Sequence, residues 1–301
     1  MIVLRFFLVI GVSILGFLGT TKYTEKSGNQ ISVAYSPSYF TTDTTQLFVT
    51  SGDPSKDTVL IVGEGGPKFS LDFEASGRVY WEYLSNNKNY HYAVLHQSST
   101  YNKSIFNASD FDLQDAYAEV DNSSEIMYRA IKYYKDRGKY VVVFGHSYSA
   151  WIIPHYLATR PSLADKYVIT GGRLNADPVQ TAYQLKGINT GFAEDGKTLE
   201  LPDENQKQNP YRTDRYWQIR KTKELLKYAI GKPRYTEELA DQDLSKLIFC
   251  FGYYDQNVGA LSEEEIAFLK AKNAQVLGVE TGHYEIWKRV IDAFERGDIK
   301  L

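Results

Sequence analysis

Cysteine is almost absent from this sequence: Cys250 is the only one among 301 residues. One cysteine cannot form an internal disulfide, and it cannot supply a cysteine-rich zinc site. The sequence also lacks a Gly-x-Gly-x-x-Gly nucleotide loop, and its five histidines do not have the spacing of metal ligands. We therefore expect neither a metal ion nor a nucleotide cofactor.

A basic excess and a long hydrophobic run are also missing. The chain has 34 Lys+Arg and 37 Asp+Glu, a formal net charge of −3, which gives no electrostatic reason to expect a nucleic-acid partner. Residues 6–19 are almost wholly apolar but fall short of the roughly 20 residues that a membrane-spanning helix needs. We interpret residues 1–21 as a secretory signal peptide or an uncleaved membrane anchor. The domain at residues 22–301 would then be secreted, periplasmic or anchored facing outside the cytoplasm.

Short β-branched runs alternate with segments of helical periodicity through most of the chain. Several of the runs are continuously apolar, as is typical of strands covered on both faces. The predicted strands are Gln46–Thr50, Thr58–Val62, Tyr92–His96, Lys139–Phe144, Lys166–Thr170, Leu247–Phe251 and Gln275–Val279. This alternation predicts an α/β fold, with a mainly parallel sheet flanked by helices.

Capping patterns indicate where helices begin. Ser262 and Glu265 form a capping box ahead of an apolar periodic run. Asn122 and Glu125 have the same spacing before another such run, which predicts a helix with Asn122 as its N-cap.

One long interval interrupts the alternation of strands and helices. Residues 178–245 contain no good strand, whereas Thr213–Ile230 has helical periodicity. The interval is too long for a bare connection, so we interpret it as a helical cap inserted late in the chain. Between Tyr211 and Tyr235 it has eight Lys or Arg against two acidic residues. This excess is either a solvated helix face or an attraction for an acidic substrate or an anionic membrane surface.

The most informative segment is Gly145-His146-Ser147-Tyr148-Ser149, which lies between a predicted strand and a helical segment. A sharp strand-to-helix turn of this kind, a nucleophile elbow, holds a serine hydroxyl clear of the sheet. Residues beside the serine must be small, and Gly145 meets this requirement. Ser149 stands where the usual pattern has a second glycine. The segment predicts Ser147 as a nucleophile.

A nucleophilic serine needs a general base, and the base needs a group that orients it. In the chain order Ser, acid, His, the histidine must follow the elbow. His155 lies on the same predicted helix as the elbow, which leaves His283, separated from the last predicted strand by a short Glu-Thr-Gly turn. Asp255 follows the preceding strand and is the expected acid, with Asp177 as the alternative.

A glycine-rich loop, Gly63-Glu64-Gly65-Gly66-Pro67, follows the predicted strand Thr58–Val62. Glycines let the backbone approach a substrate closely, and backbone N–H groups aimed at a developing negative charge form an oxyanion hole. We expect the N–H of Tyr148 and that of Gly65 or Gly66 to play this role. Glu64 either binds a substrate amine or pairs with a neighbouring side chain.

Together, these elements resemble the α/β-hydrolase superfamily over roughly residues 30–301. The loop Glu64–Pro67 is similar to the His-Gly-Gly-Pro-Gly loop of proline iminopeptidase-like members, with Glu64 in place of the histidine and Lys68 in place of the final glycine. The resemblance implies a serine hydrolase, esterase-, lipase- or aminopeptidase-like. It would cleave an ester, amide or thioester of a small-molecule or peptide acyl substrate. A catalytically inactive binding protein and an acyltransferase that uses the same serine are the alternatives.

Overall fold

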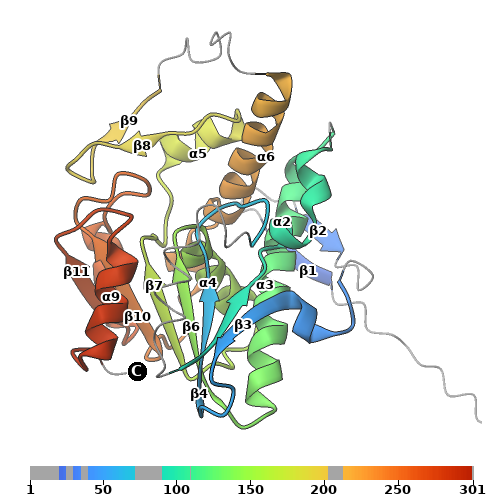
Figure 1. The fold of residues 1–301 in the computed structure, drawn as a ribbon. Coiled ribbons are helices and arrows are strands. Elements are labelled where there is room, and N and C mark those ends of the chain that lie inside the picture. Colours follow the sequence, from blue (N-terminus) through green and yellow to red (C-terminus); the bar gives the residue numbers. More distant parts are fainter. Residues whose placement is uncertain are drawn as a thin grey trace, which may run out of the picture.

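The computed structural model describes residues 20–24, 30–34, 40–71, 90–108, 110–202 and 213–299. Within these ranges the centre of the molecule is a seven-stranded sheet with the order β11-β10-β7-β6-β4-β5-β3 (Figure 1). Its strands are β3 (Phe48–Gly52), β4 (Thr58–Gly63), β5 (His91–Leu95), β6 (Tyr140–His146), β7 (Lys166–Thr170), β10 (Leu247–Gly252) and β11 (Gln275–Val279). All neighbours pair parallel except β3, which pairs antiparallel with β5 at one edge.

Each of the seven predicted strands is confirmed, with ends shifted by two residues at most. The largest difference is at β3, where a 3-10 helix, η2 (Thr44–Leu47), occupies the start of the predicted strand. The Asp43 side chain accepts a hydrogen bond from the Thr45 N–H at 2.9 Å and so caps this turn. The extended backbone therefore begins only at Phe48.

Helices cover both faces of the sheet. The α-helices are α2 (Ser98–Tyr101), α3 (Leu113–Lys135), α4 (Tyr148–Thr159), α5 (Pro178–Leu185), α6 (Asp214–Gly231), α7 (Tyr235–Glu238), α8 (Glu263–Ala271) and α9 (Ile286–Glu295), and a second 3-10 helix is η3 (Lys103–Phe106).

Alternation along β4 shows how the apolar strands serve two cores. Val59 and Ile61 pack in the cluster that includes the buried faces of α3 and α4, whereas Leu60 and Val62 pack in the cluster with α9. Because successive side chains point to opposite faces of a sheet, a strand buried on both faces must be apolar throughout. This is the physical reason that the continuous apolar runs predicted the strands.

The start of α3 differs from the prediction. Asn122 is not an N-cap: it lies inside the helix and is 7% exposed. The N-cap is Asp112, which forms a capping box with Asp115. Both positions match the capping pattern, but buried Ala116 and Tyr117 already belong to the apolar face, so the helix starts ten residues earlier.

The interval between β7 and β10, which we call the insertion (residues 178–245), contains α5, α6 and α7. It also contains two strands of two residues each, β8 (Gly191–Phe192) and β9 (Leu199–Glu200), which pair antiparallel and are too short for a sequence pattern to reveal. Helix α6 is capped by Thr213 and packs against α3 and α5. In Figure 1, α5, α6 and the β8–β9 pair lie beyond one end of the sheet.

The N-terminal part of the described chain is a two-stranded antiparallel pair, β1 (Thr20–Thr24) and β2 (Gln30–Ala34). Residues 6–19 lie outside the described residues, so the signal peptide or anchor remains a prediction. In the part of the chain that the structure describes, no helix combines the length and apolar character required to cross a membrane.

Candidate active site

Ser147 occupies a strained turn between β6 and α4. Its backbone has φ 57° and ψ −115°, in the positive-φ region that residues other than glycine rarely adopt. The Ser147 N–H donates to the Thr170 carbonyl on β7 at 3.0 Å, which ties the turn to the neighbouring strand. A Cβ at Gly145 would lie 2.6 Å from the Ser149 backbone oxygen. Only glycine therefore lets the strand and the helix approach this closely.

The structure brings Ser147, His283 and Asp255 together from three different strand ends. The His283 Nε2 lies 2.9 Å from the Ser147 Oγ, and its Nδ1 lies 2.7 Å from the Asp255 Oδ2. His283 is 5% exposed and Asp255 is 1% exposed. An ionised carboxylate only accepts hydrogen bonds, so Nδ1 carries the proton, and the Nε2 lone pair faces the serine hydroxyl.

Asp255 is itself held in place by the backbone that follows β10. Its Oδ1 accepts hydrogen bonds from the N–H groups of Asn257 at 2.9 Å and Val258 at 3.0 Å. The alternative acid, Asp177, caps α5 instead by accepting from the N–H groups of Val179 and Gln180. The carboxylate beside His283 is thus that of Asp255.

His146 lies next to His283 but is not a competing base. The centroids of the two rings are 4.9 Å apart, and the His146 Nδ1 is 3.1 Å from the Thr170 Oγ1. Burial, reinforced by the charge that His283 can carry, lowers the pKa of His146 to about 3. This imidazole therefore stays neutral at physiological pH.

The glycine-rich loop after β4 lies against the elbow. A Cβ at Gly65 would lie 3.1 Å from the Ser147 Cβ and 3.5 Å from its Oγ. The Gln97 Nε2 donates to the carbonyls of Glu64 at 2.9 Å and Gly65 at 2.8 Å. Since N–H and C=O point in opposite directions in a trans peptide, the N–H groups of Gly65 and Gly66 point away from Gln97.

Two residues that hold this loop had no assigned role in the sequence analysis. Gln97 comes two residues after the end of β5, and its position at a strand end next to that of β4 was the available signal. Ser149 was noted only for being small, yet its Oγ donates to the Glu64 carbonyl at 2.6 Å. The Glu64 side chain is 6% exposed and pairs with the Lys68 ammonium at 3.0 Å, which favours pairing with a neighbour over binding a substrate amine.

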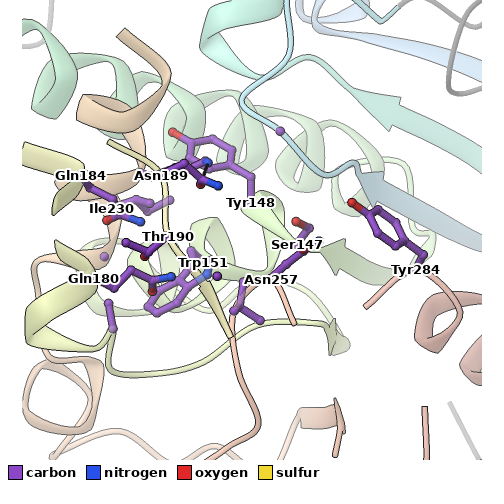
Figure 2. Close-up of a pocket in the computed structure, with 16 residues that line it drawn as sticks. Ser147, Tyr148, Trp151, Gln180, Gln184, Asn189, Thr190, Ile230, Asn257 and Tyr284 are labelled. Carbon is purple, nitrogen blue, oxygen red and sulfur yellow. Dashed lines mark hydrogen bonds between the residues drawn. The ribbon is translucent and has the colours of Figure 1, made fainter. Parts of the chain in front are cut away.

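A pocket of about 290 Å³ opens beside Ser147. Gly66, Tyr148 and Trp151 come from the loop and the elbow helix, and Asn257 and Tyr284 come from the segments after β10 and β11. The insertion completes the wall with residues of α5, α6 and the segment before β8. Figure 2 shows Ser147 between Trp151 and Tyr284, with the labelled side chains from the insertion on the side of Ser147 away from Tyr284.

The basic residues of the insertion have different surroundings. Lys223 lies 4.6 Å from the centre of the Phe69 ring, Arg215 donates to Asn107, and Lys227 lines the pocket. Arg212 lies outside the described residues. Among the described residues, no three His, Cys, Asp or Glu side chains gather in an arrangement that could hold a metal ion.

Comparison with known proteins identifies the fold. No family model matches the chain, and no curated protein matches it by sequence. Among solved structures, a lipase-esterase related protein from Clostridium acetobutylicum is 14% identical with a TM-score of 0.52, covering 84% of this chain and 98% of its own. MenH from S. aureus is 16% identical with a TM-score of 0.50, covering 83% and 97%.

A structure from the study of LipS and LipT, two metagenome-derived lipolytic enzymes, is 12% identical with a TM-score of 0.51, covering 84% of this chain and 96% of its own. At these identities the likeness concerns the fold. Together with the sheet order and the elbow, it shows that the chain has the α/β-hydrolase fold.

Proposed function

We propose that the protein is a serine hydrolase that cleaves an ester, amide or thioester through an acyl-enzyme intermediate on Ser147. The observation that carries the proposal is the hydrogen-bonded chain from Ser147 through His283 to Asp255, which starts at a serine in a strained turn. A surface histidine would not need a buried carboxylate on one nitrogen and a serine hydroxyl on the other. Lipolytic proteins among the similar structures support the same chemistry.

In the acylation step, the Ser147 Oγ attacks the substrate carbonyl carbon while its proton passes to the His283 Nε2. The carbonyl π bond breaks, and the resulting oxyanion accepts hydrogen bonds from the Tyr148 N–H and the N–H of Gly65 or Gly66. Asp255 holds the imidazole in the required tautomer and stabilises the imidazolium that forms. The tetrahedral intermediate then expels the leaving group, which takes the proton from Nε2.

Water completes the reaction in a deacylation step that uses the same residues. His283 removes a proton from a water molecule, whose oxygen attacks the acyl carbon, and the bond to the Ser147 Oγ breaks as the proton returns to the serine. The acid product leaves, and the free enzyme is restored. Because the loop carbonyls of Glu64 and Gly65 are already engaged by Gln97, the loop N–H groups need little rearrangement during either step.

A fluorophosphonate probe tests this proposal directly, because it reacts much faster with an activated serine than with an ordinary one. We expect the purified protein to be labelled at Ser147, as mapped by mass spectrometry, and labelling to disappear in Ser147→Ala and His283→Ala. The exposed Ser245→Ala variant serves as the control and should be labelled like the unmodified protein. Turnover of p-nitrophenyl acetate should fall by roughly 10⁴-fold or more in Ser147→Ala.

Two outcomes would point to the alternative functions. Absence of labelling in a folded sample, verified by circular dichroism, would contradict the hydrolase and favour a binding protein with this fold. Labelling at Ser147 with acyl transfer to an added alcohol in preference to water would favour an acyltransferase. Product analysis by mass spectrometry with competing alcohols separates hydrolysis from acyl transfer.

A further inference from the structure

The wall of the pocket that faces Ser147 from the insertion is polar. Gln180 and Gln184 come from one face of α5, Thr190 follows it, and each is at least nine-tenths buried. Lys227 of α6 and Asn189 complete this wall. In Figure 2 the side chains of Gln180, Gln184 and Thr190 lie on the same side of Ser147 as Trp151, away from Tyr284.

Two atoms of this wall are buried without a hydrogen-bond partner. Gln184 is 7% exposed and Thr190 is 5% exposed, and within the described part of the chain neither the Gln184 Oε1 nor the Thr190 Oγ1 has a partner. Buried polar groups in folded proteins are nearly always hydrogen-bonded. Both atoms belong to residues that line a pocket beside a nucleophile, which indicates a ligand that supplies the missing bonds once the two side chains turn toward it.

The charge of the wall is balanced, which restricts the ligand. The Lys227 ammonium donates to the Glu224 Oε1 at 2.9 Å and to the Asn189 Oδ1 at 2.9 Å. Glu224 is 3% exposed, so its carboxylate neutralises Lys227 inside the protein. An anionic group would gain little here, and a cation would meet the paired ammonium. The wall therefore suits a neutral group that donates hydrogen bonds.

The remaining lining adds an apolar surface to this polar one. Trp151 and Ile230 line the same pocket, as does Tyr148. A hydroxyl-bearing ring or short polyol presents both surfaces, because its C–H groups pack on an aromatic face while its hydroxyls donate and accept. An aliphatic chain would instead leave the Gln184 and Thr190 atoms unsatisfied, at a cost in binding.

We infer that this pocket recognises a neutral, hydroxyl-bearing group of the substrate, of the size of a monosaccharide or short polyol, with a hydroxyl donating to the Gln184 Oε1 and another bonded to the Thr190 Oγ1. This inference rests on the proposed function, since it places the recognised group next to the carbonyl attacked by Ser147. It distinguishes the substrate class from the esters of simple fatty alcohols.

Two acetate esters of similar size test the inference: a methyl glucoside acetylated at O6, and cyclohexylmethyl acetate. We expect the unmodified protein to have at least a tenfold higher kcat/KM for the sugar ester. Gln184→Leu and Thr190→Val should each reduce this preference by about tenfold, mainly through a higher KM for the sugar ester, because uniform binding is lost. Hydrolysis of the cyclohexylmethyl ester should fall less than that of the sugar ester, so the readout is the ratio of the two kcat/KM values.

The controls separate this inference from the proposal on which it rests. Gln242→Leu makes the same chemical change at an exposed position outside the pocket and should keep the preference. Each variant is also labelled with the fluorophosphonate. Labelling at Ser147 without a preference for the sugar ester, or an equal loss on both esters in Gln184→Leu, would overturn the inference while the hydrolase stands. No labelling of the unmodified protein would overturn both.

Discussion

At the scale of single residues, Ser149 shows how one side chain joins two parts of the candidate site. Its Oγ donates to the Glu64 carbonyl at 2.6 Å across 85 positions of sequence, and the residue is 1% exposed. A Cβ at Gly63 would lie 2.6 Å from the Ser149 Cβ. The absence of a side chain at Gly63 thus makes room for a serine where the usual elbow has glycine.

We predict that Ser149→Ala weakens the loop without removing the elbow. The Cβ that packs against Gly63 is kept, and the Gln97 amide still donates to the Glu64 carbonyl, but one buried hydrogen bond is lost. The free energy of unfolding should fall by about 1 kcal/mol, as measured by urea denaturation. Because the loop supplies an oxyanion donor in the proposed mechanism, kcat should fall by roughly tenfold with little change in KM.

Lys68→Ala provides the comparison for this experiment, since it breaks the Glu64 side-chain pair without touching the Glu64 carbonyl bond. It should affect kcat less than Ser149→Ala does. An unchanged kcat in Ser149→Ala would contradict a role for this hydroxyl in positioning the loop.

The residues that the sequence predicted for the site have a common property: each follows a predicted strand of a parallel sheet. Ser147, Asp255 and His283 come after β6, β10 and β11, whose carboxyl ends share one edge, so local patterns sufficed to predict their proximity. Gln184 and Thr190 lie in the insertion, outside the seven-stranded sheet, so no strand of that sheet fixes their direction. Their position beside Ser147 depends on packing that no local pattern encodes.

At the scale of whole elements, helix starts were the weakest part of the sequence analysis. Ser262 and Glu265 were correctly predicted to cap α8, because the periodic apolar residues begin directly after Glu265. For α3 the real capping pair is Asp112 and Asp115, ten residues before the predicted one. A helix whose buried face includes small and polar residues gives a weak periodic signal in its first turns.

We predict that Asp112→Ala destabilises the protein by about 1 kcal/mol, as is typical for the loss of an N-cap. The Asp112 carboxylate accepts from the N–H groups of Gln114 at 2.8 Å and Asp115 at 3.0 Å, and alanine leaves both donors to water. Thermal denaturation followed by circular dichroism measures the change. Gln114→Ala, at an exposed neighbouring position, should have little effect; equal effects of the two variants would argue against the cap.

At the scale of the whole molecule, the burial of histidines couples stability to pH. Burial lowers the pKa of His91, His96, His146 and His155 below the ordinary value of 6.5. Each of them is therefore neutral in the folded protein at a pH where the unfolded chain would already bind a proton. The unfolded state is favoured as the pH falls through this window.

His96 allows this coupling to be tested away from the serine, because its Nδ1 contacts only Thr100, at 2.9 Å, in the hydrogen bonds of the described residues. Burial lowers the pKa of His96 to about 4 from 6.5. Between pH 6.5 and 4 the unfolded chain binds one more proton at this position, so stability must fall as the pH decreases. Glu125, whose pKa is raised by burial, acts in the opposite direction, because the folded protein binds its proton more readily than the unfolded chain does.

We predict that the free energy of unfolding decreases from pH 7 to pH 5, and that His96→Gln reduces this decrease by roughly 1 kcal/mol, allowing for the partial exposure of His96. Glutamine keeps a polar group near Thr100 but binds no proton, so the variant can be less stable at pH 7 and still lose less on acidification. Guanidinium denaturation at both pH values gives the difference, in which the cost of the substitution itself cancels. If the decrease were the same in His96→Gln and the unmodified protein, His96 would have the same pKa in the folded and unfolded states, and its burial would not contribute to the loss of stability in acid.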